Sequence, residues 1–188
     1  ASVSDVMDEG PLMFTGNNLD VAVNGKGWLA VQLPDGSEAY TRAGSLEVEV
    51  TGLLQTKSGY PMVGDGGPIS VPPDNRVEIA PDGTVSVIPK FGTPNNASAI
   101  GRIKLVNPPE ATLVRGSDGL FRVNNGQPAA RDDGVKLTSG TLEGSNVNVT
   151  DAMVNLISLS RQFEMQIKLL QTADTNAQRA DQLLSLNA

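Results

Sequence analysis

The sequence contains neither cysteine nor histidine in its 188 residues. Their absence excludes disulfides, thiol nucleophiles, Ser–His pairs and every metal site built on Cys or His ligands. Aromatic residues make up only 4% of the chain, which disfavours the stacking surfaces that bind single-stranded nucleic acid. No run approaches the roughly 18 apolar residues that a membrane-spanning helix needs. We therefore predict that the chain is not an enzyme and that it uses no cofactor or metal.

Positive charge is also scarce. The chain carries 14 basic and 21 acidic residues, a net charge of −7. An acidic surface disfavours nucleic acid, because phosphate neutralisation needs clustered Lys and Arg. The first ten residues are polar and acidic, and they lack the basic start and apolar core of a secretory signal peptide.

Helix breakers are absent from the last forty residues. All 20 glycines and 12 prolines lie at or before Gly144. From residue 148 to residue 188 the chain follows one helical pattern, which predicts a single long helix.

This predicted helix carries a seam of apolar or small residues at alternating spacings of three and four. Gln166 interrupts the seam once, and Met153, Ile157, Leu169 and Leu183 widen it. The spacing is that of a coiled-coil heptad, and the breadth suits a helix that touches more than one neighbour. We predict a subunit interface at Ala152, Leu156, Leu159, Phe163, Ile167, Leu170, Ala173, Ala177, Ala180 and Leu184. A helix that folds back on its own domain is the alternative, but nothing upstream supplies an apolar partner of equal length.

The region before the helix has the pattern of short β-strands joined by tight turns. Apolar residues alternate with polar ones, as in Leu46, Val48 and Val50, and five Asp-Gly and two Asn-Gly pairs interrupt the strands. Such pairs favour hairpin turns because both residues tolerate positive φ. We predict a mainly β protein, an antiparallel meander, sandwich or open barrel with a coiled-coil-like C-terminal helix. The predicted ranges are a flexible lead-in over 1–13, a β body over 14–147 and the axial helix over 148–188.

Candidate chemical sites in the β body are weak. The Asp-Gly turns lack the Asp-x-Asp-x-Asp-Gly spacing of a calcium loop. Glu47 and Glu49 share one strand face, which simple alternation explains as a solvated face. The glycine-rich run 64–67 has no following Lys-Ser/Thr, so it does not predict a phosphate loop. Trp28 is expected in the core rather than at a ligand site.

Several long segments resemble one family. The junction Leu142, Glu143, Gly144, Ser145, Asn146, Val147 and Asn148, followed by a long striped helix, resembles the junction of bacterial flagellar rod and hook proteins. The run 19–64 is similar to the body domain of the same family. The segments 161–168 and 176–184 are most similar to the proximal rod type, and the distal rod type is the nearest competitor.

The resemblance implies a non-enzymatic structural subunit of the flagellar basal-body rod, the axial structure that crosses the periplasm and transmits torque. It implies export through the flagellar export apparatus without a cleaved signal. It also implies other rod subunits as partners, including copies of this chain and the neighbouring proximal and distal rod proteins. In the family an N-terminal helix pairs with the C-terminal one, and we expect that helix to be missing here.

The sequence is also compatible with two other classes of function. A secreted adhesin or phage-tail-like binding module could use the β body for recognition and the helix as an oligomerisation stalk. A hydrolase that uses only carboxylates would depend on residues such as Glu47 and Glu49.

Overall fold

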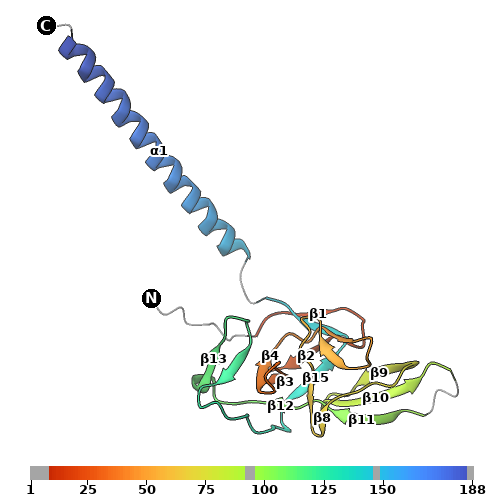
Figure 1. Cartoon of the computed structure of the whole chain (residues 1–188). Coiled ribbons are helices and arrows are strands. Elements are labelled where there is room, and N and C mark those ends of the chain that lie inside the picture. Colours follow the sequence, from red (N-terminus) through yellow and green to blue (C-terminus); the bar gives the residue numbers. More distant parts are fainter. Residues whose placement is uncertain (1–8, 92–95, 146–148, 186–188) are drawn as a thin grey trace. The chain divides into compact units, whose positions relative to one another are not determined.

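A computed structural model describes residues 9–91, 96–145 and 149–185, with helix side chains from 153 to 183. The chain divides into two units, one ending at Asn146 and the other beginning at Val147. The first is built of β-strands, and the second is the helix α1 (Val149–Ser185), as Figure 1 shows. The prediction of a mainly β, antiparallel protein with one long C-terminal helix is confirmed. The three predicted ranges stay predictions as domain boundaries.

The strands of the β unit are short, and every pairing in the described part of the chain is antiparallel. One 3₁₀ turn, η1 (Glu110–Thr112), interrupts them. In chain order the strands are β1 (Leu12–Phe14), β2 (Val21–Asn24), β3 (Trp28–Gln32), β4 (Glu38–Thr41), β5 (Leu46–Val48), β6 (Leu54–Thr56), β7 (Val63–Gly64), β8 (Gly67–Pro68), β9 (Asn75–Ile79), β10 (Thr84–Pro89), β11 (Ser98–Arg102), β12 (Leu105–Val106), β13 (Leu113–Arg115), β14 (Phe121–Val123), β15 (Lys136–Ser139) and β16 (Thr141–Glu143).

The largest sheet has five strands in the order β12-β3-β4-β14-β13, and a three-stranded sheet has the order β11-β10-β9 (Figure 1). Four two-stranded pairs complete the unit: β1-β16, β15-β2, β5-β6 and β7-β8. Some paired strands are far apart in the sequence. The pairing of β15 with β2, for example, places the end of the β unit beside its beginning.

Strand β3 lies at the centre of the core, because both of its faces are buried. Leu29 and Val31 belong to the larger apolar cluster, whereas Trp28 and Ala30 belong to a smaller cluster that includes Tyr40. Successive side chains of a strand point to opposite faces, so β3 separates these two clusters. The expectation that Trp28 is a core residue is confirmed: it is buried, and its ring centroid lies 4.5 Å from that of Phe121.

Three of the Asp-Gly turns share one geometry. At Leu33-Pro-Asp-Gly36, the Gly36 N–H donates to the Leu33 carbonyl, and the Leu33 N–H donates to the Ser37 carbonyl. The turns that end at Gly83 and Gly119 repeat both bonds. The pattern is a type I turn closed by a glycine at positive φ.

The predicted role of the Asp in these turns needs correction. Only the glycines take positive φ there, and the sole non-glycine with positive φ among the described residues is Asp74. The carboxylates of Asp35, Asp82 and Asp118 instead accept the N–H two residues ahead. Their contribution is therefore a side-chain hydrogen bond that stabilises the turn, not a left-handed backbone.

The alternating pattern also predicts strands over residues 69–71 and 101–106, and these two predictions are wrong in different ways. The run 69–71 forms only the isolated bridge Leu53↔Ser70. The run 101–106 is split, because Ile103 and Lys104 lie between β11 and β12 and donate their N–H groups to Gly83 and Val63. Strands β1, β13 and β16 were missed, since their side chains do not alternate clearly between apolar and polar.

Candidate assembly interface

Helix α1 runs for 37 residues, and its sequence explains its length. It contains no glycine or proline to interrupt the backbone hydrogen bonds. The hydroxyls of Thr172 and Thr175 donate to the carbonyls of Lys168 and Gln171, so these polar groups are satisfied within the helix.

The apolar seam of α1 is exposed along its described length. Exposed fractions of its large side chains range from 39% at Ile167 to 70% at Leu170. The described residues of the predicted interface are Leu156, Leu159, Phe163, Ile167, Leu170, Ala173, Ala177 and Ala180, all of them exposed. Ala152 and Leu184 lie outside the described side chains. An apolar surface this long is typical of a contact surface rather than of a free helix. The predicted interface remains a prediction, because the structure contains a single chain.

The junction before the helix is described from Leu142 to Ser145, and Asn146, Val147 and Asn148 lie outside the described residues. Leu142 and Glu143 are half-buried and belong to β16, which pairs with β1 in the register Leu12↔Glu143 and Phe14↔Thr141. The junction therefore contains a strand that holds a segment from the beginning of the chain.

Glu143 makes the best-defined polar contacts at this junction. Its Oε1 accepts the Gly10 N–H at 2.8 Å, and its Oε2 accepts the Arg42 Nε–H at 2.6 Å. The Arg42 Nη1 donates to the carbonyls of Gly25 and Gly27 at 3.0 and 2.9 Å. The sequence drew attention to Glu143 but gave no sign of Arg42.

The candidate chemical residues do not form a site. Glu47 accepts a hydrogen bond from Gln55, and Glu49 accepts one from Thr51. Within the described residues there is no group of three or more Asp and Glu side chains placed to hold a metal ion. Residues 64–67 form the turn end of the small β7–β8 hairpin. None of the described helices is long and apolar enough to span a membrane.

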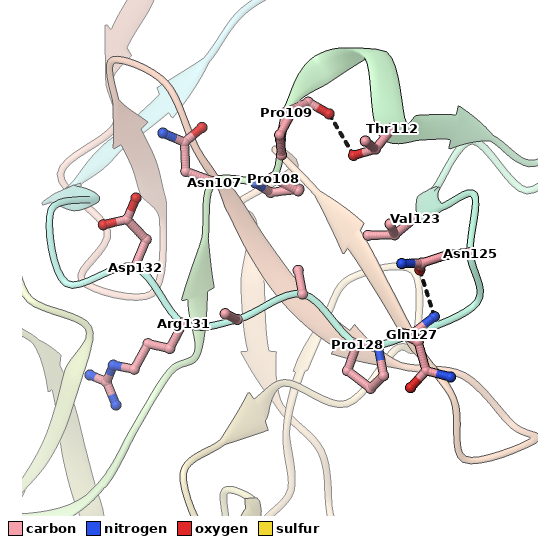
Figure 2. Close-up of a pocket in the computed structure, with 12 residues that line it drawn as sticks. Asn107, Pro108, Pro109, Thr112, Val123, Asn125, Gln127, Pro128, Arg131 and Asp132 are labelled. Carbon is pink, nitrogen blue, oxygen red and sulfur yellow. Dashed lines mark hydrogen bonds between the residues drawn. The ribbon is translucent and has the colours of Figure 1, made fainter.

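A hollow of about 430 Å³ lies between η1 and the loop before β15. Two of its hydrogen bonds are local: the Thr112 hydroxyl donates to the Pro109 carbonyl, and the Gln127 N–H donates to the Asn125 side chain, as Figure 2 shows. Arg131, at its edge, is ion-paired with Asp65 and Asp133. The hollow thus offers no convergent set of catalytic groups.

The shifted pKa values have structural causes. A hydrogen bond from Arg122 lowers the pKa of Asp118 to about 2. Hydrogen bonds from Ser37 and Thr84 lower the pKa values of Asp35 and Asp82, and burial raises the pKa of Tyr40, whose hydroxyl accepts the Ala129 N–H. These groups serve turns and the core, so their shifts do not indicate catalysis.

Two family models match the chain. Residues 138–183 match the C-terminal region of flagellar basal body rod FlgEFG proteins, and residues 22–87 match the D1 domain of flagellar hook proteins FlgE/F/G. The flagellar basal-body rod protein FlgF of Escherichia coli K12 is 44% identical over 187 residues, which cover 96% of this chain and 74% of the relative. The chain belongs to the flagellar basal-body rod FlgEFG family. It is a structural, non-enzymatic subunit of the rod.

Other members of the rod family agree. FlgF of Salmonella typhimurium LT2 is 43% identical over 96% of this chain and 74% of its own length. FlgG of Buchnera aphidicola from Schizaphis graminum is 35% identical over 97% of this chain and 71% of its own length. The chain thus resembles these two FlgF members more than this FlgG member. Membership decides against the adhesin and hydrolase alternatives.

The first family match includes the junction and most of α1, and the second includes β2 to β9 with much of the core. The junction, most of the helix and most of the run 19–64, which carry the family resemblance, therefore lie within the two matched regions. Arg42 lies in the second match and Glu143 in the first, so their ion pair joins the two regions.

Proposed function

We propose that this rod subunit assembles through the apolar seam of α1, which packs against helices of neighbouring subunits to build the axial shaft that transmits torque. The observation that carries the proposal is an uninterrupted 37-residue helix with an exposed apolar seam. At about 1.5 Å per residue such a helix spans roughly 55 Å, so one subunit can contact partners over a long axial distance.

The energy of such packing is large. Burying one leucine or phenylalanine side chain contributes roughly 1.5–3 kcal/mol. Leu156, Leu159, Phe163 and Leu170 are each more than half exposed in this chain. The alanines of the lower seam, Ala173, Ala177 and Ala180, permit a close approach between helix backbones. The proposed contact is therefore knobs-into-holes packing with tighter spacing toward the C-terminal end.

The proposed partners are copies of this chain, the neighbouring proximal and distal rod proteins, and an N-terminal helix of the kind that the family resemblance implies. The proposed location is the rod within the periplasm. We infer that the chain reaches it through the flagellar export apparatus without a cleaved signal. Family membership supports this route.

The test is complementation of a strain that lacks this chain. Leu156→Asp and Phe163→Asp each place a charge in the proposed contact, and an unpaired buried carboxylate costs more than the roughly 2–7 kcal/mol of an unpaired neutral polar group. We expect both variants to abolish swimming and to be missing from isolated basal bodies, while circular dichroism shows a folded β unit.

The matched control is Ser158→Asp, which adds the same side chain on the polar face of α1. It is expected to swim and to enter basal bodies normally. The proposal fails if both seam variants assemble like wild type, or if the control is as defective as they are. Measuring secreted protein in a rod-assembly mutant separates a defect in export from one in packing.

A further inference from the structure

Two segments far apart in the sequence form a small ladder beside the junction. Strand β1 pairs with β16, and the Gly144 N–H donates to the Pro11 carbonyl at 2.8 Å. At the other end, the Thr15 N–H donates to the Gly140 carbonyl at 2.7 Å. The ladder therefore extends from Gly144 back to Gly140 and holds the chain before β1 next to the residues that lead into α1.

Apolar packing contributes little to this ladder. All three residues of β1 are exposed, and Phe14 is 84% exposed. In β16 only Thr141 is buried. A two-stranded ladder without an apolar face is marginally stable in water, so other contacts must hold β1 and β16 in place.

Arg42 supplies those contacts at the junction end. Its Nε bonds Glu143, whose other oxygen accepts the Gly10 N–H, so a single carboxylate joins both segments to one guanidinium. The same guanidinium donates to two carbonyls of the β2–β3 turn and lies 5.9 Å from the Trp28 ring centroid. Arg42 thus connects the ladder to the core.

The environment strengthens these bonds. The side chains of Arg42 and Glu143 are only 18% and 10% exposed, whereas those of the surface pair Lys26–Glu110 are 73% and 54% exposed. Charge-assisted hydrogen bonds shielded from water are stronger and less sensitive to salt than exposed pairs. A β-carbon at Gly10 would overlap the Gly144 carbonyl, which shows how closely the segments approach.

We propose that Arg42 is a positioning residue that, through Glu143, holds β1 and β16 to each other and to the β body. It would keep the segment that begins the β body and the segment that ends it in a constant position relative to the core. The planar fork of arginine is what the geometry requires, because Nε reaches Glu143 while Nη1 reaches the Gly25 and Gly27 carbonyls. A lysine ammonium keeps the charge but is a single point that cannot cover both positions.

Hydrogen exchange on the full chain tests the proposal independently of the proposed rod function. In Arg42→Lys, we expect the amides of Gly10, residues 12–14 and residues 140–144 to exchange about tenfold faster than in wild type. Exchange of core amides in β3 and β4, and the denaturation midpoint followed through Trp28 fluorescence, should change little. The matched control is Lys26→Arg in the exposed pair with Glu110, which should leave exchange of the ladder unchanged.

A second variant covers the case in which Arg42→Lys does not fold. Arg42→Met with Glu143→Leu replaces the ion pair by apolar side chains of similar size, an exchange that buried ion pairs often tolerate. This double variant should fold and still show fast exchange in β1 and β16. The proposal is overturned if the ladder amides keep wild-type protection in either folded variant, or if exchange rises equally across the whole β unit.

Discussion

The β unit and α1 place their apolar residues in opposite ways. In the β unit, Leu29, Val31 and Tyr40 are almost completely buried by strands from distant parts of the same chain. In α1, Leu156, Phe163 and Leu170 are exposed. The β unit buries its apolar side chains against one another. In α1, the apolar side chains stay exposed among the described residues.

This difference separates folding from assembly. A substitution in the β core should change the stability of the isolated chain. A substitution in the α1 seam should instead change its assembly with other subunits. The junction belongs to the first category, because its polar contacts lie within the β unit. The following predictions test this division, beginning with the largest effect.

Shortening one leucine in each unit should produce the clearest contrast. Leu29→Ala removes a fully buried side chain and should destabilise the β unit by about 2–5 kcal/mol. Leu170→Ala, on exposed helix surface, should change the stability of the β unit within the isolated chain by less than about 0.5 kcal/mol. Urea unfolding followed through Trp28 fluorescence measures both, and equal losses would contradict the division.

A backbone contact provides a second contrast, within the β unit itself. Gly44 is buried, and a β-carbon there would overlap the Val21 carbonyl. Gly44→Ala should therefore cost roughly 1–3 kcal/mol through overpacking. Gly66→Ala is the matched control, because open space surrounds its β-carbon position and its φ is not positive. Thermal unfolding measures the stability of both variants. Equal stability losses would show that the close approach at Gly44 does not affect stability.

The smallest expected effect concerns the Asp118–Arg122 pair at the surface of the β unit. The pKa of Asp118 is lowered from 3.8 to about 2, chiefly by the Arg122 hydrogen bond. Because the folded pKa is the lower one, this stabilisation is present above pH 3.8 and is lost as the pH falls toward 2. An NMR titration of the Asp118 carboxyl should give a midpoint near 2.

Arg122→Gln is the informative partner variant, and in it the Asp118 midpoint should rise toward 3.8. An unchanged midpoint would assign the shift to the Leu120 N–H instead, which also bonds this carboxylate. Since the pair is exposed, the change in overall stability should be slight.

Helix α1 was predictable from the sequence because its signals are local. The loss of glycine and proline after Gly144 and the spacing of three and four residues require only neighbouring positions. The turns at Gly36, Gly83 and Gly119 were predictable for the same reason, although the backbone role of the Asp residues was not. The core position of Trp28 followed from its apolar neighbours in β3.

The elements that the sequence did not predict depend on residues that are distant in the sequence. Strand β1 has exposed side chains and no alternation, so nothing in its sequence marks it as a strand. It exists because β16, more than a hundred residues later, provides its hydrogen-bond partners. The break between β11 and β12 likewise depends on which distant carbonyls accept the N–H groups of Ile103 and Lys104.

The sequence by itself determined the long helix, its apolar seam, the glycine turns and the absence of Cys and His side chains, because each depends on residue types and short spacings. Only the tertiary structure decided that Arg42 bonds Glu143 across 101 positions and that Glu143 reaches Gly10 across 133. Such contacts are set by how the strands pair and by the shielding of charges from water, and neither is encoded at short range.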